Sequence, residues 1–227
     1  MNEYILINPT TEIVNQYDRI WKGNQNKEDY RIKLFDHICI DIRDYYNLKM
    51  IKSFGEQDRM IDDYRKKNDV DMFFAKLNTV YHTRLNTKGI AEAWSSAGWT
   101  LLPDTTMTPD TLIELCKQKT GSYAYSFSSK VFSFIDPDTY PIMDKYVVNM
   151  LRAYGIKGIS TWGDYKKYIE AYNEFRKKFK LDTLSYKKID QFLWTYANLL
   201  ERYWEKEGVI FFNNTVSYKS KTNNKEI

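Results

Sequence analysis

One lysine and one aspartate in the second half of the chain have the types and the spacing to do chemistry together. Lys130 lies in the apolar stretch 126–135, and Asp144 follows fourteen residues later, just after Pro141. A lysine amine can attack an electron-poor carbon, and a carboxylate can stabilise positive charge that develops there. Cleaving the bond between a base and its sugar builds such charge on the sugar. The pair therefore indicates an enzyme that acts on N-glycosidic bonds.

The sequence leaves open how the two residues divide the work. In one hypothesis Lys130 attacks the sugar carbon and forms a Schiff base, provided that burial lowers the pKa of its amine. Such an enzyme would also nick the strand. In the other, Asp144 activates water and the product is an intact abasic strand. Asp144 is also placed to cap a helix that begins at Lys145, and Lys130 could contact a phosphate instead.

The same stretch resembles the active-site segment of the helix-hairpin-helix (HhH-GPD) DNA glycosylases. Ser126, Ser128 and Lys130 fall on the Gly-x-Gly-x-Lys pattern of their hairpin, and residues 141–144, Pro-Ile-Met-Asp, fall on their Pro-x-x-Asp turn. The resemblance implies that Asp144 and Lys130 are catalytic and that Ser126, Ser128 and Ser129 contact the DNA backbone. The lysine, and the lack of four cysteines for an iron–sulfur cluster, place the chain nearest to the 8-oxoguanine glycosylase-like branch.

A fold and a partner follow from that resemblance. It implies a mainly α protein with two helical lobes that flank a DNA-binding cleft. Residues 23–130 would form one lobe, a helical bundle that ends in the hairpin, and residues 1–22 with 131–227 would form the other. Lys130 and Asp144 would face each other across the cleft. The expected partner is double-stranded DNA that contains a damaged or modified base, bound by a monomer.

An enzyme that flips a base out of the helix needs aromatic or apolar walls around that base. The sequence offers Phe127, Tyr140, Tyr146 and Trp194 as candidates. It does not identify the base. By resemblance the default is an oxidised purine, in DNA repair. A hypermodified cytosine of the kind found in phage genomes is the alternative, and the enzyme would then serve in phage defence.

Positive charge is concentrated directly after the candidate site. Residues 145–188 hold eleven Lys or Arg and four Asp or Glu, a net charge of +7, so the rest of the chain nets −3 within a total of +4. Affinity for nucleic acid comes largely from neutralising phosphates. We therefore expect Lys145, Lys166 and Lys167 to contact DNA, while a merely solvated helix face is the alternative.

Apolar periodicity predicts a mainly α fold. The clearest amphipathic helices cover residues 165–179 and 189–203, the second between a capping Ser185 and Gly208. Two apolar runs look like strands that could pair, residues 4–7 and 209–212, and residues 213–227 look like a flexible tail. The remaining predicted helices cover residues 11–22, 27–52, 57–67, 69–85, 88–96 and 109–119, the last starting at the cap Thr108.

Composition restricts the class of protein. A content of 43% hydrophobic residues, 16% of the chain being aromatic, is enough to fill the core of a folded protein. Apolar runs of four residues are far shorter than the roughly 20 needed to span a membrane, and residues 1–3 lead into no signal peptide. Cys39 and Cys116, with His37 and His82, are too few for a zinc site. We expect a cytoplasmic protein, nucleoid-associated through DNA, without metal or cofactor.

Two other functions compete with base excision. A nuclease would use several carboxylates around Mg²⁺, and Asp136, Asp138 and Asp144 are the candidates, although Asp-Pro-Asp-Thr is typical of a turn. The other alternative is a catalytically inactive DNA-binding module of the same fold.

Overall fold

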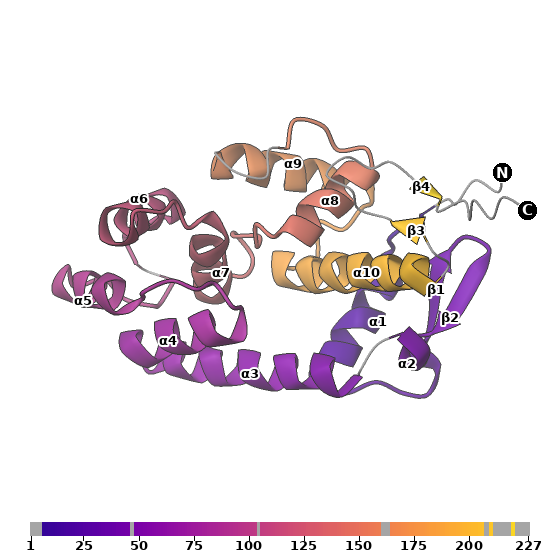
Figure 1. The fold of residues 1–227 in the computed structure, drawn as a ribbon, viewed down its shortest axis with the longest axis horizontal. Coiled ribbons are helices and arrows are strands. Elements are labelled where there is room, and N and C mark those ends of the chain that lie inside the picture. The colour runs from indigo at the N-terminus through magenta and orange to yellow at the C-terminus, as the bar shows by residue number, and fades with distance from the viewer. Residues whose placement is uncertain are drawn as a thin grey trace, which may run out of the picture.

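The computed structural model describes residues 6–45, 48–103, 105–159, 164–206, 209–210 and 219–220, and within them the protein is mainly helical, as predicted (Figure 1). In chain order the elements are α1 Thr11–Lys22, η1 Glu28–Tyr30, β1 Arg31–Phe35, β2 Ile38–Asp41, α2 Ile42–Tyr45, α3 Leu48–Lys66, α4 Val70–Val80, α5 Lys88–Ser96, α6 Pro109–Thr120, α7 Tyr125–Ile135, α8 Lys145–Ala153, α9 Tyr165–Lys178, α10 Tyr186–Lys206, β3 Val209–Ile210 and β4 Lys219–Ser220. In the described residues, no helix combines the length and the apolar character that crossing a membrane requires.

Local capping signals set several helix boundaries. The Thr10 side chain accepts the Ile13 N–H at 3.3 Å, and Gly23, at φ +73°, ends α1 in the left-handed region. Thr108 caps α6 in the same way. The predictions for residues 11–22 and 88–96 match α1 and α5, and those for residues 57–67, 69–85 and 109–119 overlap α3, α4 and α6.

The predicted helix over residues 27–52 is wrong. The chain forms a hairpin of β1 and β2 there, with Ile32 paired to Ile40, followed by α2 and the start of α3. Along β1 the residues alternate, with Arg31 and Lys33 exposed and Ile32 and Leu34 buried. That alternation has the period of two that suits a strand with one buried face, so burial favours the hairpin over a helix.

The predicted pairing of residues 4–7 with residues 209–212 is also wrong where the structure describes it. Leu6 forms an isolated antiparallel bridge with Phe35 at the end of β1. β3 pairs with β4, so Lys219–Ser220, within the predicted tail, form a strand. Gly208 and the rest of residues 211–227 lie outside the described residues.

Buried hydrophobic residues form two clusters. The terminal core draws on residues 7–51 and 143–200, with Ile113, and the central core draws on residues 61–135. In Figure 1, α4 to α7 lie at one end, α1 and α2 lie toward the other with α10 reaching to them, and α8 and α9 lie between along the top. α3 runs along both, because its Ile51 belongs to the terminal core and its Ile61 to the central core. The side chains of Phe54 and Tyr140 pack against both clusters.

Each core contains residues from both predicted lobes. The β1–β2 hairpin, in the predicted lobe 23–130, packs with the terminal core. Residues 131–135, in the predicted second lobe, belong with the rest of α7 to the central core. The reason is that α7 is buried all round from Phe127 to Ile135, so packing does not divide it at Lys130. The division into two lobes around a DNA-binding cleft stays a prediction.

A glycine lets α3 approach α1 closely. A Cβ built on Gly55 would lie 2.2 Å from the backbone oxygen of Trp21, whereas one on Gly89 in α5 would meet only Lys119 Cδ, at 4.0 Å. We expect Gly55→Ala to lower the free energy of unfolding by about 1–3 kcal/mol through overpacking. The control Gly89→Ala should leave it unchanged or raise it by up to about 1 kcal/mol. Urea denaturation measures both, and equal stability of the two variants would contradict the close packing of α1 on α3.

Candidate active site

Lys130 lies inside α7 and is almost completely buried. The structure starts this helix at Tyr125, so Lys130 is in its second turn and not at the end of a hairpin, as the resemblance implied. The residue is 5% exposed, and burial lowers the pKa of its amine against the opposing charges of Asp144 and Asp190. Its Nζ donates a hydrogen bond to Ser126 Oγ at 2.6 Å. A lowered pKa enlarges the neutral fraction, which is the nucleophilic form of the amine.

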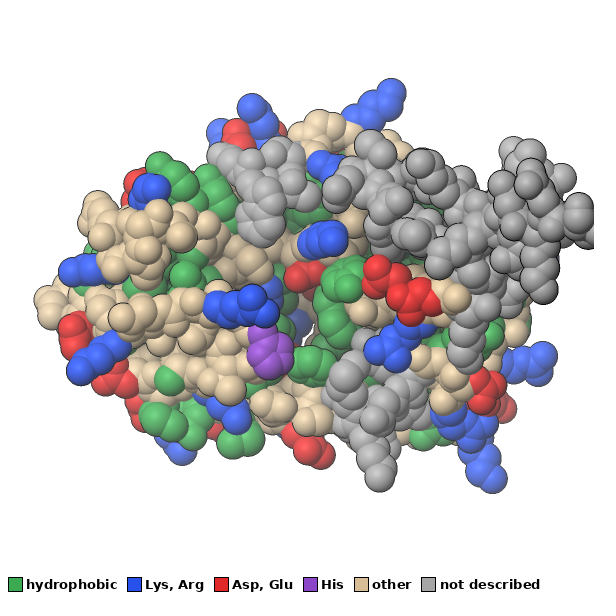
Figure 2. Space-filling model, viewed as in Figure 1, with side chains coloured by type: hydrophobic (Ala, Val, Ile, Leu, Met, Phe, Trp, Pro, Cys, Tyr) green, Lys and Arg blue, Asp and Glu red, His purple; other side chains and the backbone are tan. Residues whose placement is uncertain are grey.

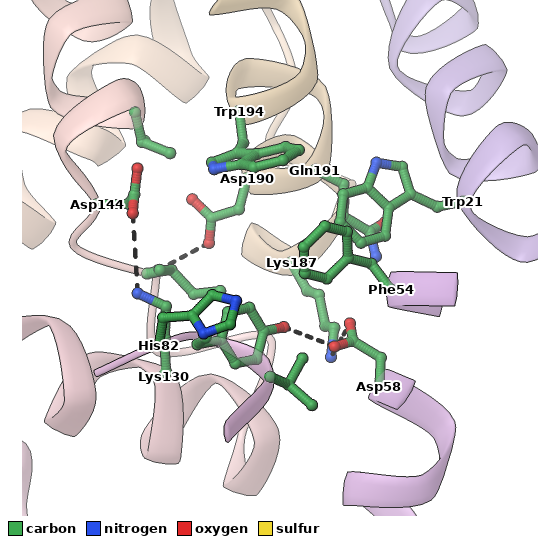
Figure 3. A pocket seen from close by; sticks show the side chains of 14 residues that line it. Trp21, Phe54, Asp58, His82, Lys130, Asp144, Lys187, Asp190, Gln191 and Trp194 are labelled. Atoms are coloured by element: carbon green, nitrogen blue, oxygen red, sulfur yellow. Dashed lines mark hydrogen bonds and ion pairs between the residues drawn. The ribbon is translucent and has the colours of Figure 1, made fainter. Parts of the chain in front are cut away.

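Asp144 faces this lysine from another element. It is the N-cap of α8, and its Oδ1 accepts the Tyr146 N–H at 2.8 Å. Its Oδ2 lies 3.8 Å from Lys130 Nζ (Figure 3). At this distance the two groups form an ion pair without a direct hydrogen bond. They therefore face each other with a narrow gap between them. The Asp144 side chain is 22% exposed and is therefore within reach of solvent.

The pair lies on the wall of a cavity of about 180 Å³. In the view of Figure 2 a hollow opens in the middle of this face, with acidic and basic side chains at its edge. Trp21, Phe54 and Trp194 form an aromatic wall with ring centroids 5.9–6.2 Å apart. The full lining is Trp21, Phe54, Asp58, Val80, Tyr81, His82, Lys130, Ile142, Asp144, Val147, Lys187, Asp190, Gln191 and Trp194. The cavity is therefore apolar on one side and rich in titratable groups on the other.

Asp190 brings a second carboxyl group to this wall. It is 3% exposed, and burial raises its pKa to about 8, although hydrogen bonds from the Ile142 N–H and the Tyr172 hydroxyl, both at 2.7 Å, lower it. The nearby Asp144 charge raises the pKa further and Lys130 lowers it. A carboxyl group whose pKa is raised to this extent exchanges its proton near neutral pH, and perturbed groups of this kind cluster at functional sites.

A third group of charges ties α3 and α4 to α10 at the same cavity. Lys187 Nζ lies 3.3 Å from Asp58 Oδ2 and 3.6 Å from the centroid of the Phe134 ring. The Tyr81 hydroxyl donates to Asp58 Oδ1 at 2.6 Å, and Lys130 Nζ lies 5.4 Å from the centroid of the Tyr81 ring. Tyr81 therefore links this group to the lysine–aspartate pair.

The serines predicted to form a phosphate-binding hairpin lie within α7. Ser128 and Ser129 have no exposed surface, so they cannot touch DNA in this arrangement. Ser126 is partly buried and accepts the hydrogen bond from Lys130. Ser129 Oγ accepts the Met143 N–H at 2.9 Å. Serine, unlike glycine, is disfavoured in the left-handed backbone of tight turns, and the apolar residues of this segment are buried as a helix.

Of the four predicted pocket residues, Trp194 lines the cavity. Tyr146 packs beside it, with ring centroids 6.3 Å apart, and burial, together with Glu201, raises the pKa of Tyr146 to about 12. Phe127 is 1% exposed and packs against Phe74 in the central core. Tyr140 packs against Phe132, at a centroid distance of 5.1 Å. The last two are therefore structural in this arrangement.

The predicted DNA-contacting lysines are on the surface. Lys145 is the first residue of α8, directly after Asp144, and its side chain is exposed. Lys166 and Lys167 are exposed in the first turn of α9, where Lys167 Nζ lies 3.3 Å from the capping Asp164. All three are accessible to a polyanion.

Sequence reasoning missed most of the cavity. Asp190 could have been found, since it falls on the same face of α10 as Tyr186 and Leu193, which are buried. A carboxylate in an apolar stripe is rare unless it is paired. Asp58 and Tyr81 carry no such signal, because they come together with Lys187 only in the folded protein.

Comparison of the chain with protein-family models, with curated proteins and with solved structures found no match. In the described residues no group of three or more His, Cys, Asp or Glu is arranged to hold a metal ion. Asp136, a candidate ligand, accepts the backbone N–H groups of Asp138 and Thr139 with its Oδ1, at 3.1 and 3.2 Å, as a turn residue does. The geometry of the cavity is therefore what indicates a function.

The raised pKa of Asp190 predicts a pH-dependent stability. Between the pKa of an unfolded aspartate, about 3.9, and about 8 the folded protein holds a proton that the unfolded chain has released. Stability therefore falls as pH rises through this window, by up to about 1.4 kcal/mol per pH unit. Asp190→Asn cannot titrate, so its stability relative to the wild type should rise from pH 5 to pH 8 in urea denaturation. For the exposed Asp182→Asn the difference from wild type should stay constant; a constant difference for Asp190→Asn as well would contradict the raised pKa.

Proposed function

We propose that this protein is a DNA N-glycosylase, which flips a damaged or modified base out of duplex DNA and cleaves its bond to the sugar. The observation that carries the proposal is the 3.8 Å separation of the Lys130 amine and the Asp144 carboxylate on the wall of an aromatic cavity. A nucleophile and a charge-stabilising group that can both reach one reacting carbon are what this reaction needs.

The electrostatics of the pair suit that reaction. As the base departs, positive charge develops on the sugar, and a fixed carboxylate stabilises it best where water is largely excluded. Asp144 is fixed through its own Oδ1 bond to Tyr146 N–H, which leaves Oδ2 directed at the gap. Lys130 contributes an amine whose pKa burial lowers.

The cavity suits a single flipped base. Its volume of about 180 Å³ is below the range of roughly 300–1,000 Å³ typical for drug-sized ligands, so a small planar group is the better fit. A base can stack on the rings of Trp21, Phe54 and Trp194, a contact worth about 1–3 kcal/mol per base. Gln191 and His82 add hydrogen-bonding groups to the same lining.

Two routes through the site balance chemically. In the first, the neutral Lys130 amine bonds to the sugar carbon while the base leaves with the bonding electrons and takes up a proton. Loss of the amine proton and opening of the sugar ring then give a Schiff base. In the second, water adds to the carbon, its proton passes to Asp144, and the base leaves as before. The lowered pKa of Lys130 favours the first route.

We expect Asp144→Asn to reduce base release by about 10²-fold or more, because it removes a charge that stabilises the transition state. Release is measured by mass spectrometry on duplexes that carry 8-oxoguanine, on duplexes that carry glucosylated hydroxymethylcytosine, and on genomic DNA of several origins, phage DNA included. Borohydride should trap a covalent adduct between the protein and an abasic duplex, and Lys130→Gln should abolish it. The exposed Lys119→Gln is the control.

Each other result separates the alternatives. If Lys130→Gln releases the base as well as the wild type does, and borohydride traps no adduct, the reaction is assigned to water activated by Asp144. Strand cutting that requires Mg²⁺ and ignores base identity would support a nuclease. Binding of duplexes without release of any base would support an inactive DNA-binding module and would overturn the proposal.

The same proposal predicts sequence-independent DNA affinity from α9. Reversing Lys166 and Lys167 to Glu should weaken binding to every duplex alike and flatten the dependence of log affinity on log salt, because fewer counterions are released. Reversal of the exposed Lys27 and Arg31, outside the basic segment 145–188, makes the same change of charge and should have a smaller effect. Fluorescence anisotropy across a salt series measures both. Equal loss in the two double variants would show a response to net charge alone.

A further inference from the structure

The segment that leads into Asp144 is extended, and side chains hold its backbone. Residues 141–143 lie between the turn after α7 and the start of α8, and Pro141 and Met143 are buried. Four hydrogen bonds from three helices hold their polar groups: Tyr165 Oη to the Pro141 carbonyl at 2.6 Å, Tyr168 Oη to the Ile142 carbonyl at 2.6 Å, the Ile142 N–H to Asp190 Oδ2 at 2.7 Å, and the Met143 N–H to Ser129 Oγ at 2.9 Å. We call this set of contacts the clamp.

Asp190 is the member of the clamp that costs most to bury. A serine or asparagine could accept one backbone N–H without an ionisable group, whereas burial disfavours the ionised form of this carboxyl group and raises its pKa to about 8. Its other oxygen is also occupied, because Tyr172, which has no exposed surface, donates to Oδ1 at 2.7 Å. Both oxygens are thus fixed, and the N–H that Oδ2 accepts belongs to Ile142, two residues before Asp144.

We propose that Asp190 is a positioning residue, which holds Ile142 so that Asp144 Oδ2 faces the Lys130 amine at the cavity wall. The proposal rests on the proposed base excision. Asp190 does not touch the reacting atoms in this role. It acts through the backbone. Asp190, on α10 of the terminal core, holds Ile142, and Ser129, on α7 of the central core, holds the next residue, Met143. The two contacts fix the segment from both sides.

Substitutions separate position from charge. In Asp190→Asn the side-chain oxygen can still accept the Ile142 N–H, and the amide can donate to the Tyr172 hydroxyl, so the clamp is kept and the ionisable group is lost. Asp190→Ala removes both. Tyr168→Phe removes the hydrogen bond to the Ile142 carbonyl without changing any charge. It tests the clamp if Asp190→Ala does not fold.

We expect the single-turnover rate of base release to fall about 10²-fold in Asp190→Ala, as for a small misplacement of a catalytic group. Asp190→Asn should stay within about threefold of wild type, and DNA affinity should change little in all three variants. Tyr168→Phe should slow release by about tenfold. The probe is the duplex from which the wild-type protein releases a base. Equal losses for Asn and Ala would assign the effect to the charge or the proton of Asp190 and would overturn the positioning role.

Hydrogen exchange tests the clamp without using activity. In Asp190→Ala the Ile142 amide should exchange about tenfold faster or more, the change that loss of one hydrogen bond brings, while amides within α8 and α10 keep their rates. Unchanged exchange at Ile142 overturns the inference even if the enzyme excises bases. Faster Ile142 exchange in Asp190→Ala, together with a wild-type protein that releases no base from any duplex, would instead defeat the proposed function, and with it the role of the clamp.

Discussion

The burial of one amine is the constraint on which the rest of the site depends. Placing the Lys130 ammonium where it is 5% exposed costs hydration energy, and the carboxylates of Asp144 and Asp190 oppose that cost. The three groups come from α7, from the cap of α8 and from α10. Removing one partner of such a set leaves a buried charge uncompensated. The relative positions of these three helices are therefore fixed by electrostatics as well as by packing.

The site lies where the two hydrophobic cores meet. Phe54 and Tyr140 pack against both cores, and the Asp58–Lys187 ion pair joins α3 to α10 there. A cavity at such a boundary responds to any movement of one core against the other, and ligand sites are common at boundaries of this kind. The 3.8 Å gap between Lys130 and Asp144 is then set jointly by both cores. Neither core contains the pair alone.

Local signals in the sequence were sufficient for much of the fold. Thr10, Gly23 and Thr108 set helix ends through bonds to their own neighbours, and the predicted helices there were confirmed. The same reasoning was wrong for residues 27–52. Charged and apolar residues alternate along β1, a pattern that suits a strand and not the helix that was predicted there. Sequence reasoning also expected the serines before Lys130 to form a hairpin, whereas they continue the helix α7.

For the site, the sequence by itself determined two residues and the chemistry they can do. Lys130 and Asp144 are near in the chain, and their types and the turn at Pro141 are local properties. The tertiary structure alone decided the rest: that Lys130 is buried, that Asp190 holds Ile142 from 48 positions away, and that Trp21 and Trp194 share a wall. Periodicity defines which face of a helix is apolar, but not which other face it meets. That choice is made by the packing of all helices together, and the environment that lowers the pKa of an amine or raises that of a carboxyl group exists only after it is made.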